Sequence, residues 1–208
     1  MYTFVKEKEI FKKGFISLGG VDEAGRGPLA GPVVAACVVL TPDFKPANQN
    51  IFQVNDSKKL SGKKREELYE IIIENVKEVG VGICDHKTID RINILEATFL
   101  AMKKAISSLK KRPEFLLLDG RFKIPNLSIA QEAIIKGDEL IFSVAAASII
   151  AKVERDRIMK ALHNDYPEYG FDKHKGYGTK LHVENLKKHG SSPVHRVSFK
   201  PVKKLLSA

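Results

Sequence analysis

The sequence predicts an α/β domain built on a mixed β-sheet that is flanked by helices. Short apolar runs alternate with longer segments of helical periodicity, and two apolar runs come before the first predicted helix. A sheet that opens with a hairpin gives this order of elements. With 208 residues, the chain is also long enough to bury a substantial core without disulfides.

Four apolar runs are predicted to be strands, because they are short, rich in Val, Ile, Leu and Phe, and bounded by Gly or Pro. The predicted strands span residues 18–22, 33–40, 79–84 and 115–119. The first two form the opening hairpin.

Helical periodicity predicts helices between and after these strands. The first, over residues 61–79, places Leu68, Ile71, Ile72 and Val76 on one face. The others are predicted over residues 93–109, from 138 to beyond 151, and over 179–188.

The pattern changes after residue 165. Residues 166–208 are polar and basic and contain one clear short helix, so we expect a small helical carboxyl-terminal part. Because this part is too short to fold alone, it should dock on a core formed by residues 1–165.

The chain is basic, and its positive charge is concentrated near the carboxyl end. The formal charge is +10, and residues 171–208 hold nine Lys or Arg against two acids. Such a field favours a polyanionic partner, because Lys and Arg that neutralise phosphates release condensed counterions. A solvated basic surface explains the same composition, so charge alone leaves both interpretations open.

Cysteine usage and hydropathy indicate the compartment. Cys37 and Cys84 lie in apolar runs, as small buried hydrophobic residues do in a protein from a reducing compartment. The amino-terminal residues lack the apolar core of a signal peptide, and no apolar run approaches the roughly 20 residues that span a bilayer. We therefore expect a cytoplasmic protein that does not enter a membrane.

Two adjacent acids end the first predicted strand. Asp22 and Glu23 are followed by a loop of Gly25, Arg26 and Gly27. Adjacent residues on a regular strand face opposite sides, so the strand should end or bulge here if both acids serve one site. A solvated surface turn is the alternative. A dinucleotide-binding loop is disfavoured, because the glycine spacing is wrong and the acids would repel a pyrophosphate.

Two further acids are candidates for the same site. Asp119 follows an apolar strand, where open α/β sheets place their sites, although an ordinary Asp-Gly turn explains it equally. Asp156 continues the inner face of a predicted helix, where an unpaired carboxylate is costly, unless it pairs with Lys152 or Lys160. If the four acids converge, their repulsion calls for a cation, and oxygen ligands favour Mg²⁺ or Mn²⁺.

Several motifs, in order, resemble the ribonuclease HII family. They cover nearly the whole chain and read GVDEAGRGPLAGPVVAA, DSKKLS, IDRINILEATFLAM, LLLDG, KGD, SVAAASIIAKVERDR, YPEYGFDKHKGYGT and HRVSFKPV. The resemblance implies a ribonuclease H-like fold and an endonuclease that uses Mn²⁺ or Mg²⁺, with two ions during catalysis. It also implies that Asp22, Glu23, Asp119 and Asp156 hold the family's four acidic, metal-binding and catalytic positions.

The resemblance further implies a substrate and the residues that recognise it. The family cuts the RNA strand of RNA/DNA hybrids and cleaves 5′ of single ribonucleotides embedded in duplex DNA, which serves ribonucleotide removal. It leaves a 3′-hydroxyl and a 5′-phosphate. Gly25, Arg26 and Gly27 match the loop that reads the 2′-hydroxyl, Tyr177 matches a tyrosine that packs on the sugar, and Lys58 matches a phosphate-binding position. A monomer is expected, and recruitment by a replication clamp is left open.

Three other functions are alternatives. A duplex-binding module would keep the fold without catalysis, a histidine-driven ribonuclease would work without metal and leave a cyclic phosphate, and a junction resolvase would cut all-DNA substrates. The histidines of the basic tail lack the spacing of a zinc site, so we expect them to be helix, loop or phosphate-contact residues. These are His174, His182, His189 and His195. The related ribonuclease HIII has an extra amino-terminal domain, for which we expect no room before Asp22.

Overall fold

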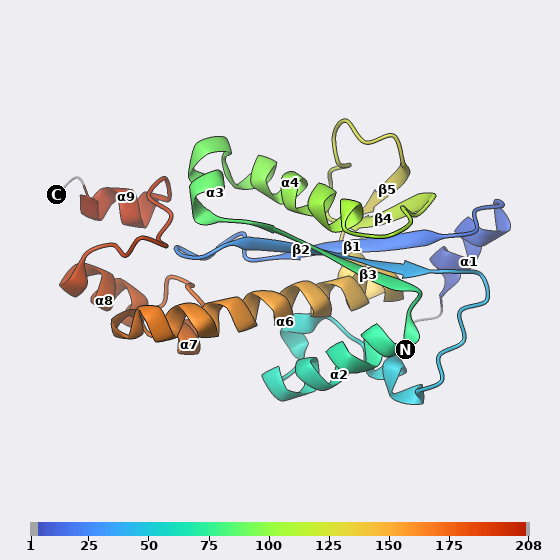
Figure 1. The fold of residues 1–208 in the computed structure, drawn as a ribbon, viewed down its shortest axis with the longest axis horizontal. Coiled ribbons are helices and arrows are strands. Elements are labelled where there is room, and N and C mark those ends of the chain that lie inside the picture. The colour runs from blue at the N-terminus through green and yellow to red at the C-terminus, as the bar shows by residue number, and fades with distance from the viewer. Residues whose placement is uncertain (1–3, 207–208) are drawn as a thin grey trace.

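The computed structural model describes residues 4–206, which form a five-stranded sheet with the strand order β3-β2-β1-β4-β5 (Figure 1). The strands are β1 (Leu18–Ala24), β2 (Val33–Leu40), β3 (Glu78–Cys84), β4 (Phe115–Asp119) and β5 (Ala130–Ile134). β1, β2 and β3 pair antiparallel, whereas β4 and β5 extend the sheet parallel to β1. The predicted mixed sheet with an opening hairpin is confirmed. The sequence does not predict β5, because AQEAI lacks an apolar run.

Helices cover both faces of this sheet. The α-helices of the described residues are α1 (Val5–Lys12), α2 (Gly62–Asn75), α3 (His86–Ile92), α4 (Ile94–Ser107), α5 (Gly137–Leu140), α6 (Phe142–Asp165), α7 (Phe171–His174), α8 (Lys180–His189) and α9 (Lys200–Leu206). In Figure 1, α4 lies above the sheet against β2 and β3, and α6 lies below it against β1 and β2. α2 packs on the outer side of α6.

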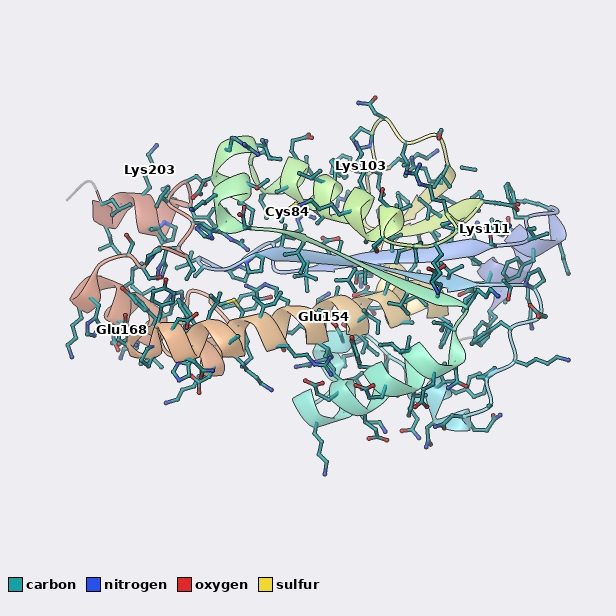
Figure 2. All side chains as sticks on the ribbon, in the orientation of Figure 1. Cys84, Lys103, Lys111, Glu154, Glu168 and Lys203 are labelled. Carbon is teal, nitrogen blue, oxygen red and sulfur yellow. The ribbon has the colours of Figure 1, made fainter. Side chains whose placement is uncertain are left out.

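The buried strand β2 divides its side chains between two apolar cores. Ala35 and Cys37 belong to the core between the sheet and α4, and Ala36 and Val38 belong to the core between the sheet and α6. Successive side chains of a strand point to opposite faces, which explains this division. Cys84, labelled on β3 in Figure 2, belongs to the α4 core. Both cysteines are free and buried. Among residues 4–206, no helix has the length and apolarity needed to cross a membrane.

The helices approach the sheet closely because glycines leave room for them. A Cβ atom at Gly20 of β1 would lie 2.1 Å from the main-chain carbon of Ser143 on α6. On the other face, Cβ atoms at Gly80 and Gly82 of β3 would lie 2.1 Å from the carbonyl oxygens of Ala105 and Ala101 on α4. The positions of α4 and α6 therefore depend on the absence of side chains at these points.

The carboxyl-terminal residues pack against the end of the sheet. α7, α8 and α9 lie together at one end of the molecule, where Figure 2 labels Glu168 and Lys203. Phe171, Leu186 and Val202 share a small apolar core with Leu29 and with α6. A division of the chain at residue 165 stays a prediction.

We expect Gly20→Ala to destabilise the fold by about 3 kcal/mol, because the added methyl group overlaps the backbone of α6. Urea denaturation gives the change in the free energy of unfolding. Gly62→Ala is the matched control: its Cβ meets only the Arg65 side chain, at 3.9 Å, and it lies at the first position of α2, where alanine is favoured. Equal stability of the Gly20 variant and the wild type would contradict the close packing.

Candidate active site

Three carboxylates meet at the edge of the sheet where β1 and β4 run side by side. One oxygen from each of Asp22, Asp119 and Asp138 lies within 4.8 Å of the other two. The parallel pairing of β1 and β4 ends at Val21 and Leu118, so Asp22 and Asp119 are the next residues of neighbouring strands. Asp22 is 4% exposed and Asp138 is also 4% exposed. The family resemblance implies the meeting of Asp22 with Asp119, but Asp138 is missing from the predicted site.

Asp138 reaches the cluster from α5, of which it is the second residue. The main-chain amide of Gly137 donates to Asp119 Oδ1 at 2.8 Å, which places the first turn of α5 against the end of β4. Lys136 has φ of +60°, a conformation that turns the chain back toward the sheet. The motif KGD, which is part of the family resemblance, is the sequence signal that could have identified Asp138.

Glu23 lines the same cavity but lies outside the group of three acids. The sequence predicts that the strand ends or bulges here. β1 does not bulge, because Asp22 and Glu23 pair regularly with Ala36 and Ala35 of β2, and it ends at Ala24, directly after the two acids. The side chains of Asp22 and Glu23 therefore leave opposite faces. Glu23 lies beyond the last residue pair of β1 with β4. Its Oε1 is 3.3 Å from a guanidinium nitrogen of Arg26.

Asp156 is not brought to the acid cluster. Lys152 donates to its Oδ1 at 2.6 Å, and Arg65 of α2 donates to its Oδ2 at 3.5 Å. Ser148, whose hydroxyl hydrogen-bonds Asp22, precedes Asp156 by eight residues on α6, which is roughly 12 Å along a helix axis. The pairing with Lys152 is the alternative that the sequence leaves open for this residue.

Burial makes the carboxylates of the cluster difficult to ionise. It raises the pKa of Asp22 well above its ordinary value, and the charges of Glu23 and Asp119 raise it further. Burial and the charge of Asp138 raise the pKa of Asp119, although hydrogen bonds from the main chain oppose them. Burial also raises the pKa of Glu23, against the opposing charge of Arg26. A divalent cation would relieve this repulsion, and a set of carboxylate oxygens fits Mg²⁺ or Mn²⁺.

Lys58 places a positive charge at the rim of the cluster. Its Nζ lies 3.1 Å from Asp138 Oδ2, and its side chain is 76% exposed. Desolvation alone would lower the pKa of Lys58, but the hydrogen bond and charge of Asp138 raise it. The ammonium group therefore stays charged and remains accessible from solvent.

The loop after β1 is held by two fully buried arginines. Arg155 of α6 donates to the carbonyl oxygens of Pro32, Lys175 and Ala30. Arg196 donates to the carbonyl oxygens of the loop residues Gly25, Arg26, Gly31 and Pro32. Burial lowers the pKa of Arg155 to about 10 and that of Arg196 to about 9, so both stay charged at neutral pH.

Gly25 must be a glycine for this arrangement. Its φ is +99°, and a Cβ there would lie 2.1 Å from Nε of Arg155. The absence of a side chain at Gly25 therefore lets the loop backbone lie against the buried guanidinium group of Arg155.

Tyr177 closes the other side of the cavity. The cavity has a volume of about 210 Å³ and is lined by the acids Asp22, Glu23 and Asp119, the loop Gly25, Arg26 and Gly27, and Ser57, Lys58, Ser148, Lys152 and Tyr177. Tyr177 is 43% exposed, and its ring lies 3.8 Å from the position of a Cβ on Gly27. The structure thus gathers every residue of the predicted site except Asp156 around one cavity.

Comparison with known proteins identifies the family. The family model described as ribonuclease HII matches residues 19–202. A ribonuclease HII of Clostridioides difficile (strain 630) is 55% identical over 193 residues, which cover 93% of this chain and 73% of the relative. A ribonuclease HII of Endomicrobium trichonymphae is 51% identical over 204 residues, which cover 98% of this chain and 95% of the relative.

Solved structures share the fold. The ribonuclease H2 of Pyrococcus horikoshii OT3 matches with a TM-score of 0.75 and 28% identity, over 92% of this chain and 98% of that chain. The ribonuclease HII of Archaeoglobus fulgidus, solved in a complex with PCNA, matches with a TM-score of 0.72 and 31% identity, over 90% and 96% of the two chains. Sequence and fold agree, and the chain therefore belongs to the ribonuclease HII family of metal-dependent ribonuclease H endonucleases, which act on RNA/DNA hybrids.

Proposed function

We propose that this enzyme cleaves both the RNA strand of hybrids and the bond 5′ of a single ribonucleotide embedded in duplex DNA. Each cut leaves a 3′-hydroxyl and a 5′-phosphate, as the family resemblance implies. The observation that carries the proposal is the meeting of Asp138 with Asp22 and Asp119, two acids that share one cavity with the glycine loop and Tyr177. Removal of misplaced ribonucleotides from DNA is the matching role.

Asp22, Glu23, Asp119 and Asp138 hold the divalent metal in this proposal. Asp138 replaces Asp156 as the fourth acid, because it contributes an oxygen to the close group and Asp156 is held by Lys152 and Arg65. When bound, two Mg²⁺ or Mn²⁺ ions would supply an activated water and neutralise charge on the reacting phosphate. The four acids fix the position of the metal. Lys58 contacts a phosphate of the substrate beside them.

The glycine loop and Tyr177 select the ribonucleotide. Arg196 occupies the carbonyl oxygens of Gly25 and Arg26, so the loop main chain is fixed before substrate arrives. Small residues let this backbone approach the minor groove and hydrogen-bond a 2′-hydroxyl. Tyr177 packs its ring against the sugar that follows, from the opposite side of the cavity.

We expect Asp138→Asn to lower the rate of cleavage by more than about 100-fold, because it removes a metal-binding charge and leaves the side-chain shape. Asp156→Asn is the matched variant, with an expected loss of less than about tenfold. Initial rates on a duplex with one embedded ribonucleotide measure both, and gel-shift binding of the same duplex should persist. Similar losses in the two variants would restore Asp156 as a site acid.

Chelation by EDTA should abolish cleavage, and Mn²⁺ or Mg²⁺ added in excess should restore it. End-group analysis should then find 3′-hydroxyl and 5′-phosphate ends, and an all-DNA duplex should stay uncut. A cyclic phosphate product that forms in EDTA would support the histidine-driven alternative. Cleavage of the all-DNA control would support a resolvase.

Tyr177→Ala should weaken cleavage at a single embedded ribonucleotide by about tenfold, because the loss of an aromatic contact to a nucleotide costs about 1–3 kcal/mol. Cleavage within a long RNA stretch should fall less, since neighbouring ribonucleotides offer alternative registers. Tyr177→Phe keeps the ring and separates packing from the hydroxyl. The measurement is kcat/KM on both substrates, and equal losses would mean that Tyr177 only supports the fold.

A further inference from the structure

Three buried histidines lie behind the segment that carries Tyr177, and the proposed chemistry does not use them. His174, His182 and His195 are 9%, 0% and 1% exposed. The rings of His174 and His182 stack with centroids 4.4 Å apart. Nε2 of His182 and Nε2 of His195 lie 3.0 Å apart, which is a hydrogen-bond distance.

The hydrogen bonds around this group fix which nitrogen of each ring carries its proton. The main-chain amide of Ser192 can only donate, and it donates to Nδ1 of His195 at 2.9 Å. The proton of a neutral His195 is therefore on Nε2, which donates to Nε2 of His182. The proton of His182 is then on Nδ1, which donates to the carbonyl oxygen of Tyr177 at 2.9 Å. Each hydrogen bond in this series is therefore donated in the same direction, from Ser192 through His195 and His182 to Tyr177.

The rings of His195 and His182 must be neutral for this series of hydrogen bonds to form. A second proton on the pair would place two N–H groups face to face. Burial lowers the pKa of His195 to about 4 and also lowers the pKa of His182. His174 and His86, the other titratable groups that act on His195, lower its pKa further.

The segment around Tyr177 follows a path that glycine favours, and main-chain hydrogen bonds hold it together with the histidines. The amide of Leu29 donates to the Gly176 carbonyl and the amide of Thr179 donates to the Tyr177 carbonyl, each at 2.8 Å. Gly176 has φ of +82°, Gly178 follows Tyr177, and Lys175 has φ of +52°. His174 fixes the preceding peptide: its Nδ1 accepts from the Gly176 amide at 3.2 Å, and its Nε2 then donates to a carbonyl oxygen at 2.7 Å. His182 holds the carbonyl on the other side of Tyr177.

We propose that the histidine relay, defined as Ser192, His195 and His182, positions Tyr177 for recognition of the ribonucleotide junction. This inference rests on the proposed role of Tyr177. The relay donates to the Tyr177 carbonyl beside the Thr179 amide, and this second hydrogen bond fixes the direction in which the ring leaves the backbone. These histidines are positioning residues and touch no substrate.

Two substitutions of His182 each remove one of its two hydrogen bonds. An asparagine amide can occupy the place of Nδ1. His182→Asn therefore keeps the hydrogen bond to the Tyr177 carbonyl and loses the hydrogen bond with His195. A glutamine amide reaches the place of Nε2. His182→Gln therefore keeps the hydrogen bond with His195 and loses the hydrogen bond to the Tyr177 carbonyl. The measured quantity is selectivity, the ratio of kcat/KM on a single embedded ribonucleotide to kcat/KM on a long hybrid.

We expect His182→Gln to lower this ratio about fivefold, in line with the loss of one hydrogen bond, and His182→Asn to change it less than about twofold. Ser192→Ala should leave the ratio unchanged, because the donor that fixes the tautomer is the main-chain amide. In a Tyr177→Ala background, His182→Gln should have no further effect on the ratio. Thermal unfolding of each variant shows whether any loss is general.

The outcomes separate the relay from the role of Tyr177. If Tyr177→Ala lowers the ratio and His182→Gln does not, or if the Gln and Asn variants lower it equally, the relay only supports the fold. If Tyr177→Ala leaves the ratio unchanged, the role of Tyr177 fails and the relay proposal fails with it.

A second test needs no variant. Histidine ¹H–¹⁵N spectra of the wild-type protein at neutral pH should show the proton of His182 on Nδ1 and that of His195 on Nε2. The opposite tautomer of His182 would overturn the proposal.

Discussion

The loop after β1 keeps its shape because two buried guanidinium groups bind its carbonyl oxygens. A buried cation without a carboxylate needs several partial charges around it, and the carbonyls between Gly25 and Pro32 supply them to Arg155 and Arg196. The loop is thereby tied to α6 on one side and to the carboxyl-terminal segment on the other. Loss of either guanidinium would leave carbonyls unpaired in the interior, so the site cannot shift independently of the fold.

Local signals predict most of the sheet and the helices that cover it. β2 and β4 are recognisable because both faces of each strand are buried, so their apolar residues run together. β5 is half exposed and carries polar residues, and its pairing with β4 is set by tertiary contacts that no short window contains. The long helix predicted from residue 138 is divided at Ile141, since α5 turns to face the acid cluster before α6 begins.

In the candidate site too, local signals indicate some of the acids, and only tertiary contacts place the others. The rule that strands deliver acids to the edge of a sheet makes Asp22 and Asp119 candidates, and the family resemblance implies that they meet. Helical phase correctly makes Asp156 a buried residue, but its partner Arg65 comes from α2, 91 residues earlier, and no periodicity reveals that contact. Asp138 lies in α5, whose four residues are too few to show a helical period. Only the path of the chain in space brings its carboxylate to the other two.

The bond from Arg196 to the glycine loop joins residues 170 positions apart in the chain. During synthesis, every acid of the site therefore leaves the ribosome long before the side chain that organises the neighbouring loop. Until residue 196 has been made, the loop lacks the guanidinium group that binds its carbonyl oxygens. Late closure of this kind slows folding, because a long loop must be ordered before its contact forms. It also means that the loop beside the acids takes its final shape later than the acids themselves are made.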